Sequence, residues 1–116
     1  MAIDFSDKKV TMVVCPVDGR YGFAALATLA RQLLNIDVLD GRDCVVFVSK
    51  TRCICKIIMA DEHGTTLITR RLHQGRFEQL MMEAQGPAAK PLSAQMLADF
   101  FNGKRLFVKR QTFMNG

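Results

Sequence analysis

Apolar residues along this chain occur in short clusters, and the spacing within each cluster indicates the element that it forms. Residues 10–15 are a continuous, mostly β-branched run that is typical of a buried strand, and Pro16 ends the run. Three more strand-like runs follow at residues 45–48, 53–59 and 65–72. The connections between these three runs are short, and short connections favour antiparallel neighbours. The pattern therefore predicts four strands, of which the last three are antiparallel.

A helical period of three to four residues is clearest over residues 23–34, where apolar side chains recur on one face. Asp18 precedes this segment and is predicted to cap the helix, because its carboxylate can accept a hydrogen bond from an exposed backbone N–H. Ser93 is predicted to be the N-cap of a second helix. A short third helix is predicted over residues 77–84. Residues 85–91, which hold one glycine and two prolines, are predicted to form a surface loop.

The order of these elements is strand, helix, three strands, helices. It predicts an α+β fold in which a mostly antiparallel sheet of about four strands carries two or three helices packed on one face. The 116 residues suit a single domain over residues 1–116, with residues 1–8 and 111–116 as flexible ends. A domain of this length can bury roughly 65% of its unfolded surface, which is enough for a core without metal or disulfide.

The four cysteines are Cys15, Cys44, Cys53 and Cys55. No C-x-x-C motif is formed, and Cys53 and Cys55 lie inside an apolar run, so these thiols are interpreted as core residues rather than zinc ligands. The N-terminus lacks the apolar segment of a signal peptide, and no stretch of about 18 apolar residues occurs. We therefore expect a cytoplasmic protein with reduced cysteines, without a membrane span, a metal site or another cofactor.

Carboxylates are candidate catalytic groups, because phosphodiester cleavage usually needs several of them converging on metal ions. Asp18, Asp61, Glu62 and Asp99 are available, but their spacing matches no nuclease motif. A helix cap for Asp18 and turn positions for Asp61 and Glu62 are sufficient to account for these residues. The sequence thus predicts no catalytic residue, and a metal-dependent nuclease that acts through Asp18 or Asp61 is the less favoured alternative.

The charge of the chain indicates more about a binding partner than its overall composition does. The net charge is +5 and the pI about 9.3. Residues 41–80 carry seven Lys/Arg against four Asp/Glu, and residues 81–116 carry five against two. Such a bias favours a polyanionic partner, although a solvated basic surface and, for Arg20, a carboxylate partner within the fold are the alternatives. The candidate nucleic-acid-binding residues are Arg20, Lys50, Arg52, Lys56, Arg70, Arg71 and Arg76.

Three blocks of the chain resemble a known family. Residues 18–26 (Asp-Gly-Arg-Tyr-Gly-Phe-Ala-Ala-Leu) are similar to its helix start, and residues 45–77 to its pair of apolar strands with a Lys-Arg-Leu-x-x-Gly-Arg-Phe type ending, here Arg-Arg-Leu-His-Gln-Gly-Arg-Phe. Residues 92–103 resemble its Leu-Thr-x-x-Gln-Leu block. The family is the small accessory protein, often called TnpB, encoded beside the transposase in bacterial insertion sequences of the IS-sixty-six type. Ala60 departs from the family, which usually has Trp there.

This resemblance implies a non-enzymatic accessory protein of DNA transposition, and it implies no catalytic residues. The expected partners are the transposase, DNA or a complex of both, contacted through the basic surface. A protein-interaction module that binds the transposase or itself, without touching DNA, is the alternative. Homo-oligomer formation is left open by the sequence.

Overall fold

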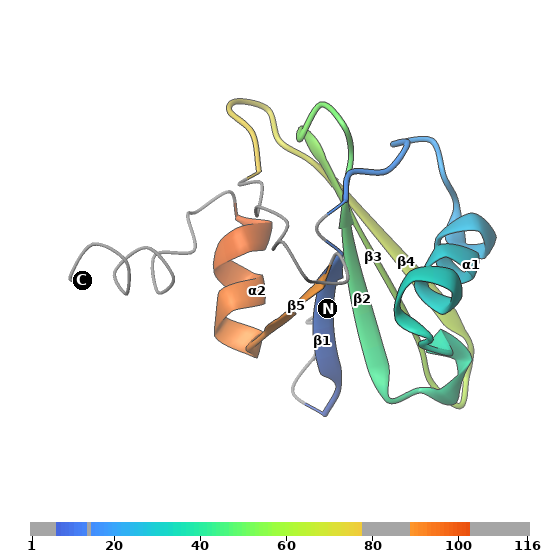
Figure 1. Cartoon of the computed structure of the whole chain (residues 1–116). Coiled ribbons are helices and arrows are strands. Elements are labelled where there is room, and N and C mark those ends of the chain that lie inside the picture. Colours follow the sequence, from blue (N-terminus) through green and yellow to red (C-terminus); the bar gives the residue numbers. More distant parts are fainter. Residues whose placement is uncertain (1–6, 14, 78–88, 103–116) are drawn as a thin grey trace, which may run out of the picture.

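The computed structural model describes residues 7–13, 15–77 and 89–102 (Figure 1). They form one five-stranded sheet, two α-helices and a 3-10 helix. The strands lie in the order β4-β3-β2-β1-β5. In chain order the elements are β1 (Lys9–Val13), α1 (Phe23–Leu34), η1 (Val38–Asp40), β2 (Asp43–Val48), β3 (Ile54–Ala60), β4 (Thr65–Arg71), β5 (Ala89–Leu92) and α2 (Ala94–Phe101).

The predicted α+β class and the mostly antiparallel sheet are confirmed. Strands β2, β3 and β4 pair antiparallel through short turns, as the sequence pattern predicts. β1 and β2 are parallel, and α1 connects them. A parallel pair needs such a crossover, because the chain must return to the starting end of the sheet before the second strand begins.

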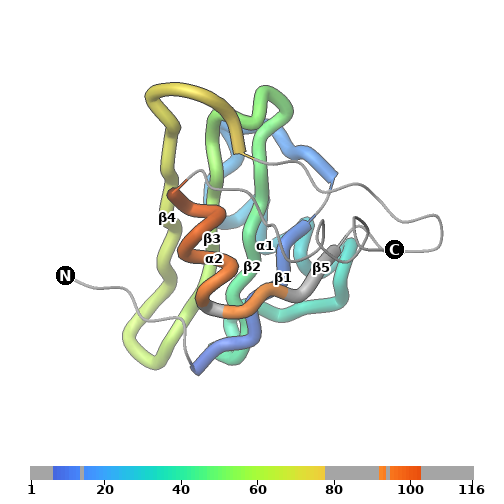
Figure 2. Tube along the Cα trace, turned by 90° about the vertical axis from the view of Figure 1, so that its left-hand side faces the viewer, coloured from blue at the N-terminus to red at the C-terminus, as the bar shows by residue number. Residues whose placement is uncertain are grey.

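The prediction that the helices pack on one face was wrong: α1 and α2 cover opposite faces of the sheet, as Figure 2 shows. The physical reason lies in β2, which is buried on both sides. Cys44, Val46 and Val48 contribute to the core under α2, whereas Val45 and Phe47 contribute to the core under α1. A strand that is apolar on both faces needs a cover on each of them.

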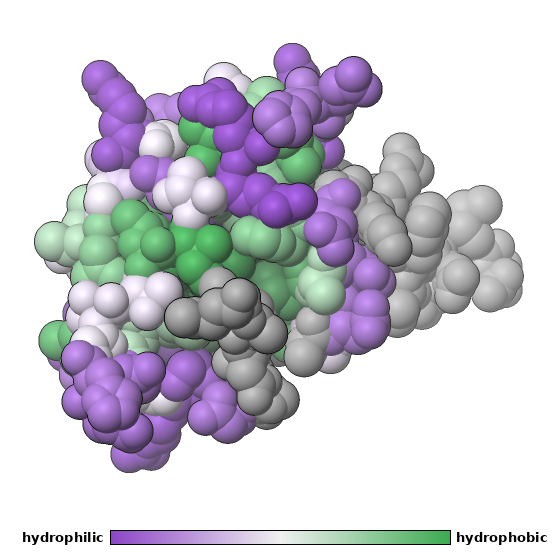
Figure 3. Space-filling view, turned by 180° about the vertical axis from the view of Figure 1, so that it is seen from behind, coloured by the Kyte–Doolittle hydropathy of each residue, from purple (hydrophilic) through white to green (hydrophobic). Residues whose placement is uncertain are grey.

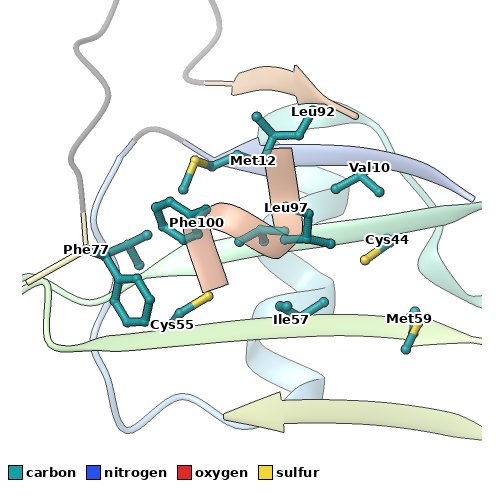
Figure 4. Packing of buried hydrophobic residues seen from close by; sticks show 12 residues of the cluster. Val10, Met12, Cys44, Cys55, Ile57, Met59, Phe77, Leu92, Leu97 and Phe100 are labelled. Atoms are coloured by element: carbon teal, nitrogen blue, oxygen red, sulfur yellow. The ribbon is translucent and has the colours of Figure 1, made fainter. Parts of the chain in front are cut away.

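The core under α2 is built from the helix, from β1, β2, β3 and β5, and from Phe77 (Figure 4). Leu97 and Phe100 of α2 are almost fully buried in it, together with Ile57 of β3. Ser93 caps the helix as predicted, since its hydroxyl oxygen accepts a hydrogen bond from the Met96 N–H at 3.1 Å.

Two predictions around this core need correction. Residues 89–92, most of which were assigned to a surface loop, form strand β5 beside β1. Pro91 is tolerated there because β5 is an edge strand. One side of an edge strand has no partner strand, so a missing N–H on that side removes no hydrogen bond of the sheet. Phe77 does not begin a helix: its N–H donates to the Arg52 carbonyl oxygen at 2.7 Å, and its ring is buried. The rest of the predicted helix, residues 78–84, lies outside the described residues.

The ends of the chain, residues 1–6 and 103–116, also lie outside the described residues. Lys8 follows directly on the N-terminal segment and is held to the fold, because its Nζ donates to the carbonyl oxygens of Gly41 (2.8 Å) and Ala60 (3.2 Å). Within the described ranges, no helix has the length and apolar character needed to cross a membrane.

Candidate nucleic-acid interface

Three loops meet at one end of the sheet, at the top of Figure 1: residues 15–22, 49–53 and 72–77. Backbone hydrogen bonds tie them together. Lys50 N–H donates to the Val17 carbonyl oxygen at 3.1 Å, and Leu72 N–H donates to the Cys53 carbonyl oxygen at 2.9 Å. We call this region, with the adjoining strand ends (residues 15–22, 49–56 and 69–77), the basic end. All seven candidate nucleic-acid-binding residues lie within it.

The basic end is anchored by a buried aromatic pair. The rings of Phe77 and Phe100 stack with their centroids 5.0 Å apart, and both are fully buried (Figure 4). In the turn between β2 and β3, Arg52 adopts a left-handed backbone conformation with φ of 65°. The Phe77 N–H bonds to the carbonyl oxygen of this same Arg52, so the loop that ends at Phe77 and the turn support each other.

Arg20 is engaged within the fold. Its Nη2 lies 2.9 Å from Asp18 Oδ2, and its Nε and backbone N–H both donate to Asp18 Oδ1. The hydrogen bonds from the guanidinium, which contribute most, and from the Arg20 backbone N–H lower the pKa of Asp18 from 3.8 to about 2. The predicted helix cap was wrong, because this local pairing occupies the carboxylate. Gly22 takes the N-cap position of α1 and supplies no side-chain hydrogen bond.

Lys56 points to the α1 face of the sheet. It is opposite Phe47, which is buried under α1, and its Nζ donates to the Tyr21 carbonyl oxygen at 2.7 Å. This contact also locates the start of α1 at the basic end. The N-terminus of a helix carries a partial positive charge, so α1 adds to the positive potential there.

Arg70 and Arg71 point to opposite faces, since successive residues of a strand alternate. Arg70 pairs with Cys55, which is buried under α2, and its guanidinium carbon lies 4.7 Å from the centroid of the Phe101 ring. Arg71 pairs with Ile54, on the same face as Lys56. The candidate residues thus do not form one flat patch: they surround the end of the sheet on both faces.

Lys50 and Arg76 complete the set from the loops, and both are exposed. In the part of the chain that the structure describes, the ion pairs are Arg20–Asp18, Arg31–Asp37 and His63–Glu62. The other six candidate cations, unlike Arg20, therefore have no carboxylate partner among the described residues.

The opposite end of the sheet has the reverse charge. We call it the acidic end; it comprises residues 7–9, 37–43 and 60–65. It carries six Asp/Glu and three Lys/Arg, whereas the basic end carries seven Lys/Arg and the single carboxylate of Asp18. Asp61 is fixed in the turn before β4, where Oδ1 accepts hydrogen bonds from the His63 and Gly64 N–H groups, and these bonds lower its pKa. Sequence reasoning missed this separation, because it brings together residues from distant parts of the chain.

A metal-dependent nuclease needs several ligand side chains close together. No set of three or more His, Cys, Asp or Glu side chains in the described ranges is placed to hold a metal ion. Asp18 and Asp61 lie at opposite ends of the sheet. Burial raises the pKa of the Cys44 and Cys55 thiols to about 12, and for Cys55 this agrees with the prediction of a core residue. The same prediction was wrong for Cys15 and Cys53, which are only partly buried.

Comparison with known proteins agrees with the resemblance seen in the sequence. The family described as IS66 Orf2 like protein matches residues 8–111. "Uncharacterized protein y4hO" of Sinorhizobium fredii is 35% identical over 79 residues, which are 68% of this chain and 66% of that protein. The similarity thus spans just under two thirds of that relative. No solved structure matches the chain. The chain belongs to the IS66 Orf2-like family, which implies an accessory role in transposition.

Proposed function

We propose that this protein assists transposition by binding DNA, alone or together with the transposase, through its basic end, and that it does so without catalysing a reaction. The separation of charge between the two ends of the sheet carries the proposal. The seven cations around one end of the sheet repel one another, and this repulsion does not help the fold. A bound polyanion would reduce it. The start of α1 adds its partial positive charge at the same place.

Contacts of this kind bind the DNA backbone rather than the bases. The aromatic residues described at the basic end are Tyr21 and Phe77, and Phe77 is fully buried. A platform on which bases stack would need several exposed rings. We therefore expect binding that depends little on sequence and strongly on salt, since each neutralised phosphate releases counterions.

The experiment is a fluorescence-anisotropy titration of the full chain with duplex DNA at several salt concentrations. The test variant is Lys50→Ala with Arg76→Ala, two exposed cations of the basic end. The control is Lys9→Ala with Arg42→Ala, two exposed cations of the acidic end that change the net charge equally. A plot of log affinity against log salt concentration has a negative slope. In the test variant this slope should become shallower by about 2, which corresponds to two lost phosphate contacts. The control should leave the slope unchanged.

Two outcomes would reject direct DNA contact: no binding of the unmodified chain at low salt, or the same loss of slope in both variants. Co-purification with the transposase, unaffected by the test variant, would then favour the alternative of a protein-interaction module. A nuclease function has its own assay, in which Mg²⁺- or Mn²⁺-dependent cleavage would have to disappear in Asp61→Ala.

A further inference from the structure

The two edges of the sheet differ in how well they are protected against pairing with another strand. β5, at one edge, has four residues and contains Pro91, which has no N–H to donate. β4, at the other edge, has seven residues and contains neither proline nor glycine. Natural sheets usually protect a long edge with prolines, charges or bulges. β4 carries charge only at its last two residues, Arg70 and Arg71, so most of this edge is unprotected.

The composition of β4 favours contact with a further strand. Four of its first five residues are Thr or Ile, and β-branched residues are enriched in paired strands. Leu67, the third residue of β4, is 38% exposed and lies between the threonines at positions 65, 66 and 69 of the same strand. Figure 3 views the molecule from the side of β4 and shows an apolar band between two polar ends. No described residue pairs with the outer edge of the strand.

Charge identifies the partner that fits this edge. β4 begins after Asp61 and Glu62 and ends in Arg70 and Arg71, so its two ends have opposite charge. A second copy of β4 placed antiparallel sets the basic end of each strand beside the acidic start of the other. A parallel copy would set like charges together. The edge is thus complementary to itself in one orientation, as a two-fold interface requires.

We propose that two copies of this chain associate through antiparallel pairing of their β4 strands, centred on Leu67. This register places the two Leu67 side chains against each other on one face and sets Thr65 opposite Thr69. It also sets Arg70 of one copy opposite Gly64 of the other, so that Arg70 lies diagonally across from Glu62 on the same face. The two sheets then form one continuous sheet, with the unprotected edges removed. The association needs no DNA and is independent of the proposed function.

The test is sedimentation equilibrium of the full chain without DNA, up to about 100 µM, a range that detects micromolar association. The unmodified chain should be a dimer. Leu67→Lys, which places two like charges at the two-fold axis, should weaken the dimer at least about tenfold, or 1.4 kcal/mol. The control is Leu33→Lys on α1, because Leu33 is 41% exposed and receives the same substitution. It should dimerise like the unmodified chain. Circular dichroism checks that both variants are folded.

A charge exchange tests the register itself. Arg70→Glu should weaken the dimer because residue 70 lies diagonally across from Glu62 of the other copy, and adding Glu62→Arg should restore it. A monomeric unmodified chain, or equal weakening by Leu67→Lys and Leu33→Lys, would overturn the proposal. A variant lacking residues 1–6 completes the set. If only this variant dimerises, the chain's own N-terminal segment covers β4 and the proposal is wrong.

Discussion

The two ends of the sheet differ in charge and in what holds their loops. At the basic end the loops are fixed by backbone hydrogen bonds and by the buried ring of Phe77. At the acidic end, polar side chains hold the loops. Lys8 donates to two carbonyl oxygens, and the Asp61 carboxylate accepts two backbone hydrogen bonds within its turn. Among the cations of the basic end, the side chains of Arg20, Lys56 and Arg70 contact other described residues, and the remaining four side chains do not hold the loops together. This difference is the reason to assign them to a partner.

The largest effect should come from removing the anchor of the basic end. Phe77→Ala leaves a cavity beside Phe100, and a buried Phe→Ala change usually costs about 3–5 kcal/mol of unfolding free energy. Urea unfolding followed by circular dichroism measures it. Leu39→Ala is the control, because Leu39 at the acidic end is 64% exposed. A similar small loss in both variants would contradict an anchoring role for Phe77.

A smaller loss is expected when the polar anchor of the acidic end is removed. Lys8→Met keeps much of the side-chain length but leaves the carbonyl oxygens of Gly41 and Ala60 without their donor. We expect a loss of about 1–2 kcal/mol in the same unfolding measurement. Lys9→Met changes charge equally at an exposed position and should cost much less. Equal losses would mean that the hydrogen bonds of Lys8 contribute nothing specific.

Relief of backbone strain at the basic end should have the opposite sign. Arg52 has φ of 65°, a conformation that costs a non-glycine residue about 1–2 kcal/mol. Arg52→Gly removes this cost but adds chain entropy to the unfolded state, so we expect a gain of up to about 1 kcal/mol. Lys50→Gly, at a position without positive φ in the same turn, should lose stability instead. Stabilisation by both glycines would argue against strain as the cause.

The smallest effect concerns the exposed pair at the basic end. Arg20→Gln removes the guanidinium that lowers the pKa of Asp18, so this pKa should rise from about 2 toward 3.8. A depressed carboxyl pKa stabilises the fold above its unfolded value, and that contribution disappears as the pH falls from about 4 toward 2. The variant should lose this part of the pH dependence. A carbon-detected NMR titration of Asp18 measures the shift, and Arg31→Gln, which pairs with Asp37 instead, serves as the control.

Local patterns predicted much of the fold. The helical period over residues 23–34 corresponds to α1, and Ser93 caps α2 as its sequence neighbours indicate. The antiparallel order of β2, β3 and β4 follows from their short turns. Asp18 was assigned wrongly although its partner is only two residues away. A helix cap and a local turn would use the same Asp18 carboxylate oxygens. Only the folded backbone shows that the donor is the Arg20 N–H and not an N–H of α1.

The sequence by itself thus determined both α-helices, strands β1 to β4, the burial of Cys55, the basic excess and the family, because each of these depends on neighbouring residues or on motif order. Only the tertiary structure decided which side chains share a surface. The strand register sent Arg70 and Arg71 to opposite faces, placed α1 and α2 on opposite sides of the sheet and collected the carboxylates at the end opposite the arginines. These arrangements result from pairing between segments far apart in the chain, and no local pattern records that pairing.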